Sequence, residues 1–156
     1  MNIACVYTVE EYNFVDTPLS VPTEIPFGIA TIITALEQVG HNVKLFVVTP
    51  DTPLIEYIDP YIKEYNPKLF CFSAVSTQYW QVKKIANYVL SKDKNIFCIL
   101  GGHEASLNPN AVINEGVFDV ICLGEGETAV VEYAKSIETG ITNKDISNLW
   151  FYDRLT

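Results

Sequence analysis

The chain reads IFCILGGHE at residues 96–104, a short apolar run that ends on two glycines. Residues 120–127 repeat this arrangement as VICLGEGE. An apolar run of this length between turn residues is typical of a strand buried on both faces of a sheet. Glycine has no Cβ, so the backbone at these strand ends can come close to a bulky partner. The two turns therefore predict a sheet edge that is built to hold a ligand.

The rest of the chain alternates between apolar runs and helical patterns. Five strands are predicted, at residues 3–7, 43–48, 69–75, 96–100 and 117–123. Apolar residues recur at helical spacing at residues 29–36, 54–62, 82–89, 108–115 and 129–137. This alternation indicates an α/β fold, a five-stranded parallel sheet that right-handed crossovers wind doubly into a three-layer sandwich. Ligands of such sheets bind at the carboxyl ends of the strands.

Length and composition narrow the classes of function. The 156 residues suffice for one domain, expected over residues 1–140, with an exit segment at 141–156 in which 146–152 is either a stray strand or a linker. The net charge of −9 argues against nucleic acid as a direct partner, because phosphates require a basic face. No apolar stretch is long enough to span a membrane, and residues 1–7 lack the basic start of a signal peptide. We therefore expect a cytoplasmic protein without a membrane partner.

The four cysteines each lie in a different apolar run, and none forms a CxxC pair. They read as reduced, buried side chains rather than as metal ligands. His103 beside Glu104 is a weak candidate for a metal pair, because adjacent residues in a turn rarely converge and His41 is the chain's one other histidine. No metal site is predicted. No Ser-His-Asp or Cys-His arrangement is indicated either, so no catalytic residue is predicted.

Three common functions of doubly wound sheets do not fit the strand ends. A dinucleotide-binding domain requires G-x-G-x-x-G after its first strand, and residues 8–12 contain no glycine. The stretch GEGETA at 124–129 fits G-x-G-x-x-A but follows the last strand, and its two carboxylates would repel a pyrophosphate. The phosphate loop of a flavodoxin is absent after strand one. The aspartate that ends strand three of a receiver domain is replaced by Ser73.

The remaining polar residues at the strand ends have two interpretations each. Ser73 lies in an apolar strand, so its hydroxyl requires a partner, either a backbone group or a ligand. Ser76 and Thr77 are expected to cap the following helix. Glu125 and Glu127 are favoured near a helix N-terminus without any ligand.

Taken together, these residues resemble the cobalamin (vitamin B12)-binding domain at the N-terminus of many radical S-adenosylmethionine enzymes. The resemblance covers about residues 1–140 and rests on an ordered set of motifs. These are PFGI at 26–29, LEQVGHNV at 36–43, SAVS at 73–76, GGHEAS at 101–106 and FDVICLGEGE at 118–127. It implies a flavodoxin-like, Rossmann-like sheet with strand order 2-1-3-4-5.

The resemblance also implies a site. The nucleotide tail of cobalamin would lie between the ends of strands three and four, with the corrin ring across the strand ends and the loop at 8–24 shielding it. Ser73-Ala74-Val75 corresponds to the Ser-x-Leu element of such domains, and Gly101-Gly102 to their Gly-Gly element. The cofactor-binding residues implied are Ser73, Ala74, Val75, Ser76, Gly101, Gly102, His103, Glu104, Gly124, Glu125 and Gly126.

Two departures from related domains refine this expectation. Mutase-type cobalamin domains carry a histidine after strand one that binds the cobalt, and residues 1–40 contain none. The Cys-x3-Cys-x2-Cys motif of the radical enzymes is absent as well, and four isolated cysteines cannot replace it. S-adenosylmethionine and the [4Fe–4S] cluster are therefore expected only in a catalytic domain outside this sequence, in the same polypeptide or in a separate chain.

The expected function is a cobalamin-binding domain without catalysis of its own, which presents the corrin to that catalytic domain for methyl transfer or another radical step. One alternative is a degenerate structural or interaction domain that has lost the cofactor. A second is a small enzyme that acts through Glu125 or Glu127, which requires a carboxylate with a raised pKa.

Overall fold

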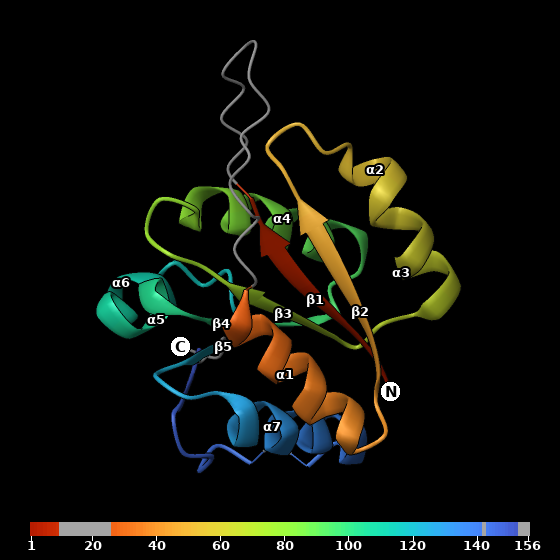
Figure 1. The fold of residues 1–156 in the computed structure, drawn as a ribbon. Helices are drawn as coiled ribbons and strands as arrows, with labels where there is room; N and C mark the ends of the chain where they lie inside the picture. The colour runs from red at the N-terminus through yellow and green to blue at the C-terminus, as the bar shows by residue number, and fades with distance from the viewer. Residues whose placement is uncertain (10–25, 142, 153–156) are drawn as a thin grey trace.

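All five predicted apolar runs form strands of one sheet in the computed structural model, which describes residues 1–9, 26–141 and 143–152 (Figure 1). The strands are β1 Asn2–Thr8, β2 Asn42–Val48, β3 Leu69–Ser73, β4 Phe97–Gly101, β5 Val120–Cys122 and β6 Leu149–Phe151. Their order is β2-β1-β3-β4-β5-β6, so the predicted order 2-1-3-4-5 is confirmed and one edge strand is added. The first five strands are parallel, and β6 pairs antiparallel with β5. Part of the segment at 146–152 is therefore a strand.

Helices cover both faces of this sheet. They are α1 Phe27–Gln38, α2 Leu54–Tyr57, α3 Asp59–Tyr65, α4 Tyr79–Lys92, α5 His103–Leu107, α6 Pro109–Asn114 and α7 Glu127–Thr139. Figure 1 shows α1 and α7 side by side on one face, while α2 to α6 lie across the other. The helix predicted at 54–62 is divided at Ile58, because Pro60 occupies the first turn of α3 and has no N–H to continue the preceding helix. The short α5 was not predicted.

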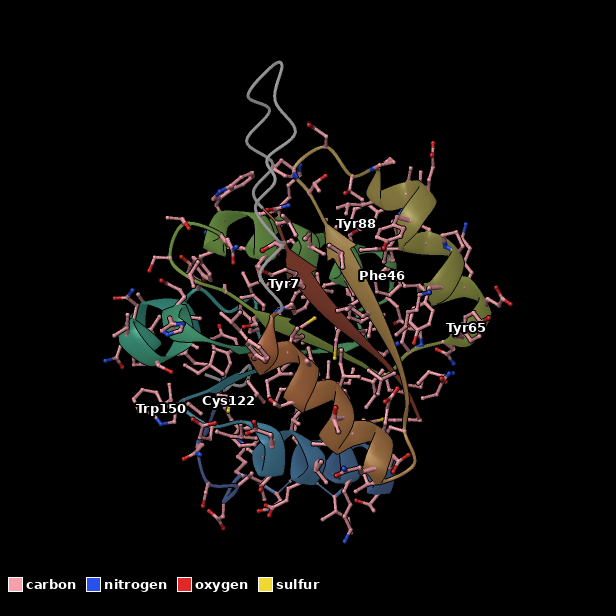
Figure 2. The ribbon with its side chains drawn as sticks, viewed as in Figure 1. Tyr7, Phe46, Tyr65, Tyr88, Cys122 and Trp150 are labelled. Atoms are coloured by element: carbon pink, nitrogen blue, oxygen red, sulfur yellow. The ribbon has the colours of Figure 1, made fainter. Side chains whose placement is uncertain are left out.

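The core divides into two layers because side chains alternate along each strand. In β3, Phe70 and Phe72 point toward α4, whereas Leu69 and Cys71 point toward α1 and α7. Figure 2 shows Phe46 on the side of α2 and α3, and Cys122 near the start of α7. Near-continuous apolar strands therefore follow from burial on both faces. The four cysteines, all among the described residues, are buried and form no disulfide.

The carboxyl ends of β3 and β4 are joined by their backbones. The Ala74 N–H donates to the Gly101 carbonyl at 3.2 Å, and the Glu104 N–H donates to the Ala74 carbonyl at 3.0 Å. These bonds continue the sheet beyond its last paired residues, Ser73 and Gly101. The turn that follows β4 is therefore tied by its backbone to the end of β3.

Candidate functional site

A cavity of about 330 Å³ opens at the carboxyl ends of β3, β4 and β5, between α1 and the N-terminus of α7. Ligand pockets of small molecules start at roughly this volume. The lining residues are Gly28, Ile29, Thr31, Ile32, Cys71, Phe72, Ser73, Ile99, Gly101, Gly102, His103, Ser106, Cys122, Gly124, Glu125, Gly126, Glu127 and Val130. The cavity lies where ligands of doubly wound sheets bind.

The floor of the cavity is apolar. Cys71, Ile99 and Cys122 come from three adjacent strands and are at most 5% exposed. Ile29 of α1 and Val130 of α7 form the walls and are equally buried. The floor can therefore accept a flat apolar group.

Polar groups line the mouth. Thr31, His103, Ser106 and Glu125 are exposed, and Glu127 is half-buried. Several are already engaged within the protein. The Thr31 hydroxyl donates to the Gly28 carbonyl at 2.9 Å, and the Ser106 hydroxyl accepts from the Gly124 N–H at 3.1 Å.

Ser73 differs from these groups. Its side chain lines the cavity and is half-buried. Within the described part of the chain, its hydroxyl takes part in none of the side-chain hydrogen bonds and has no other interaction. Of the two partners expected from the sequence, the backbone partner is therefore not observed, which leaves the hydroxyl available to a ligand.

The two glycines after β4 have different reasons to be glycine. At Gly102, φ is +87° and ψ is −172°, a region that side chains rarely adopt, and an added Cβ would lie 2.8 Å from the Ala74 carbonyl oxygen. The turn itself therefore requires this residue. At Gly101 an added Cβ would meet nothing closer than 3.9 Å, and strand alternation places it on the same face as Ile99. Gly101 thus leaves open a space that a side chain could fill.

The structure brings seven of the eleven expected cofactor residues to the cavity. These are Ser73, Gly101, Gly102, His103, Gly124, Glu125 and Gly126. Of the others, Ala74 is buried in the core beneath α4, and Val75 is exposed outside the cavity. Ser76 and Glu104 form a separate network beside it.

That network joins the end of β3 to α5. The Ser76 hydroxyl donates to one oxygen of the Glu104 carboxylate, and the Asn108 amide donates to the other at 3.0 Å. Glu104 is 7% exposed, so its carboxylate is directed into the protein. The helix α4 has no side-chain cap, so the prediction that Ser76 or Thr77 caps it is wrong. Ser76 is occupied by Glu104 instead.

Sequence reasoning missed several lining residues that come from helices and strand interiors. The missed residues are Gly28, Ile29, Thr31, Ile32, Cys71, Phe72, Ile99, Ser106, Cys122, Glu127 and Val130. The sequence did contain one signal for the floor. Cys71, Ile99 and Cys122 each stand two positions before an expected site residue that lines the cavity, namely Ser73, Gly101 and Gly124. With a period of two, such residues share a face.

Two ionisable groups at the site have shifted pKa values. The neighbouring Thr31 side chain and the backbone N–H groups at the start of α7 lower the pKa of Glu127. Burial and the neighbouring carboxylates of Glu127 and Glu125 raise the pKa of Cys122 to about 11. Glu127 is therefore a carboxylate at neutral pH and Cys122 a neutral thiol, so Glu127 lacks the raised pKa that an enzyme acting through it would require.

The described ranges contain neither a cluster of metal-ligating side chains nor a membrane-spanning helix. No group of three or more His, Cys, Asp or Glu side chains there could hold a metal ion. Residues 1–9, 26–141 and 143–152 include no helix that is long and apolar enough to cross a bilayer.

The fold and the site together define an α/β domain with a cavity at the carboxyl ends of its parallel strands. The family model for the B12 binding domain matches residues 20–134. The chain therefore belongs to the B12-binding domain family. A search of curated proteins gives no match.

Solved structures of cobalamin proteins share this fold. The radical S-adenosylmethionine methyltransferase TsrM from Kitasatospora setae, solved with cobalamin and a [4Fe-4S] cluster, is 20% identical with a TM-score of 0.79 over 98% of this chain and 29% of its own. The cobalamin-dependent radical enzyme OxsB, solved with aqua-cobalamin and S-adenosylmethionine, is 15% identical with a TM-score of 0.72, over 98% and 21%. A cobalamin-binding protein from Desulfitobacterium hafniense DCB-2 is 18% identical with a TM-score of 0.57, over 87% and 58%. The chain thus spans less than a third of the two radical enzymes.

Proposed function

We propose that this chain binds cobalamin and presents it to a radical S-adenosylmethionine catalytic domain, carried on the same polypeptide or on a separate chain. One observation carries the proposal: an open cavity with an apolar floor lies between α1 and α7, directly beneath the strand-end glycines. Family membership supports it, and so does the shared fold with two radical enzymes that contain such a catalytic part. The four cysteines, which are buried and form no disulfide among the described residues, suit a cytoplasmic location.

The residues present fit the nucleotide tail of cobalamin. The floor of Cys71, Ile99 and Cys122 would receive the flat base, because all three side chains are apolar or weakly polar. Ser73, whose hydroxyl has no partner in the described residues, would hydrogen-bond the tail at the mouth. When bound, cobalamin supplies a cobalt centre that can carry a methyl group.

The chain's own part is to bind, orient and shield. Because two backbone hydrogen bonds join the ends of β3 and β4, this part of the mouth does not have to be ordered when a ligand enters. The Ser76–Glu104–Asn108 network holds the same turns from behind. The neutral Cys122 thiol adds no charge to the floor.

The degenerate domain is the second candidate function. A domain that has lost its cofactor would be expected to fill the space with side chains, because cavities are costly in a core. The cavity here is open, and Gly101 leaves its mouth clear. This observation favours cobalamin over the degenerate reading.

The test is a visible-spectrum titration of the chain with hydroxocobalamin, followed by desalting. Gly101→Leu should abolish retention of the colour, because the new side chain would occupy the mouth, and Gly101→Ala should retain most of it. Both variants should keep the melting temperature of the parent, since Gly101 is not in a positive-φ conformation. If the parent retains no colour, or if Gly101→Leu retains as much as the parent, the proposal is wrong.

A further inference from the structure

The cavity separates polar from apolar groups by depth. The lining residues with buried or half-buried apolar side chains are Ile29, Ile32, Cys71, Phe72, Ile99, Cys122 and Val130. Carbon and sulfur atoms make up these side chains, and none carries an oxygen or nitrogen atom. The polar side chains of the lining are exposed or half-buried at the mouth. A group that enters deeply therefore leaves the polar side chains behind.

The two thiols of the floor do not change this picture. A thiol is a weak hydrogen-bond donor and a weak acceptor. Hydrogen bonding with the neighbouring Cys5 thiol already engages Cys71, which lies opposite Cys5 in the pairing of β1 with β3. The Cys122 thiol lies 3.9 Å from the Glu125 carbonyl oxygen. Neither is a strong partner for an amino group or a ring nitrogen.

From this distribution we infer that the cavity selects among cobamides by the base at the end of their nucleotide tail, in favour of an apolar benzimidazole and against a purine. The inference rests on the proposed function, because it takes the tail into the cavity. A dimethylbenzimidazole base offers methyl groups and an aromatic edge to the floor, and their burial is favourable. An adenine base of similar size would bury an exocyclic amine and ring nitrogens against the same atoms.

The size of the preference follows from the cost of unpaired polar groups. Each donor or acceptor that loses water without gaining a partner weakens binding by about tenfold or more. An apolar pocket rejects a polar analogue of the same shape by about a hundredfold at most. We therefore expect adeninylcobamide to bind between about 10-fold and 100-fold more weakly than cobalamin.

Val130 offers a way to weaken the preference for cobalamin over adeninylcobamide. It lines the cavity from α7, is 3% exposed, and has nearly the shape of threonine. Val130→Thr would place a hydroxyl on the wall, where it can pair with a purine. The matched control is Val131→Thr, the same change on the same helix at a half-buried residue outside the lining. Val130→Thr should narrow the gap between the two cobamides by at least about threefold, and Val131→Thr should leave it unchanged.

The experiment compares dissociation constants of hydroxocobalamin, aquated adeninylcobamide and aquated cobinamide, which has no nucleotide tail, by visible-spectrum titration of the full chain. The inference predicts that cobalamin binds most tightly and adeninylcobamide more weakly. Cobinamide should bind as weakly as adeninylcobamide or more weakly still. Equal affinity for cobalamin and adeninylcobamide, both above cobinamide, would overturn the base selection and leave the proposed function intact. If cobinamide binds as tightly as cobalamin, the placement of the nucleotide tail in the cavity is wrong. If none of the three compounds binds, the proposed function is wrong. A preference that Val130→Thr does not narrow would refute the assignment to the cavity wall.

Discussion

Replacing Gly102 with alanine should destabilise the fold far more than the same change at its neighbour. Gly102 has φ +87° and ψ −172°, and holding a non-glycine residue there costs about 1–3 kcal/mol. The added Cβ would also lie 2.8 Å from the Ala74 carbonyl oxygen and 3.0 Å from the Ala74 nitrogen. Both are backbone atoms that hydrogen bonds to β4 and α5 hold in place, so they cannot move aside cheaply. We expect a total loss of about 3 kcal/mol, at the upper end of that range.

Thermal unfolding by circular dichroism measures this directly. For a chain of this size, a loss of about 3 kcal/mol lowers the melting temperature by about 6–12 °C. Gly124→Ala is a graded comparison, because Gly124 has φ +74° but open space around its Cβ position, so its loss should be about 1 kcal/mol. Gly101→Ala should cost nothing measurable, since its Cβ has only ordinary contacts. A melting temperature for Gly102→Ala within 2 °C or so of the parent would refute the reasoning from backbone geometry.

Three further predictions concern buried polar groups. Glu104→Ala should cost about 1.5–3 kcal/mol in urea unfolding, because the carboxylate accepts hydrogen bonds from Ser76 and Asn108, and Glu104→Gln should cost less; equal losses would count against the network. The hydrogen bond from Tyr88 and the ion pair with Lys92 lower the pKa of Asp59, so its stabilisation is present above its ordinary pKa of 3.8 and is lost as the pH falls below it. The free energy of unfolding should therefore fall less between pH 7 and pH 3 for Asp59→Asn than for the parent. An equal fall in both proteins would show that the Asp59–Lys92 pair does not contribute to stability. With a pKa of about 11, Cys122 should react with iodoacetamide about tenfold faster for each unit by which the pH rises toward that value. Bound hydroxocobalamin should slow the reaction, which mass spectrometry follows. A reaction rate independent of pH would contradict a buried neutral thiol.

The inner strands β1, β3, β4 and β5 were predictable because each is short and largely apolar on both faces. Burial on two faces leaves a nearly continuous apolar run, and the turn residues mark its ends. The position of the cavity at the carboxyl ends of the strands followed from the same runs, since parallel strands end together. The sixth strand was left open in the sequence because residues 149–151 are too few to be distinguished from a linker.

The different structural roles of the site residues were not predictable from local sequence. Ser76 meets Glu104 across 28 positions, and nothing near either residue indicates that the carboxylate points inward. Gly101 and Gly102 are adjacent and identical, yet the turn requires one of them, whereas the other keeps a space open. This distinction depends on the Ala74 backbone, which tertiary structure alone places there.

The apolar floor of the cavity was predictable only in part. Alternation along the strands was sufficient to put Cys71, Ile99 and Cys122 on one face. Whether that face is covered or open depends on how α1 and α7 are spaced at their N-termini. Gly126 sets part of that spacing, because a Cβ there would lie 3.1 Å from the Ile32 side chain.

The most direct test of the central claim is an electron paramagnetic resonance spectrum of the Co(II) form of cobalamin bound to the chain. If the nucleotide tail lies in the cavity, its base is not on the cobalt, and the sequence has no histidine directly after β1, where mutase-type domains carry the residue that replaces it. The proposed function therefore predicts a spectrum without nitrogen superhyperfine splitting in the complex. Bound cofactor that keeps the splitting seen in free solution would show that the base stays on the cobalt, and would contradict the placement of the tail in the cavity.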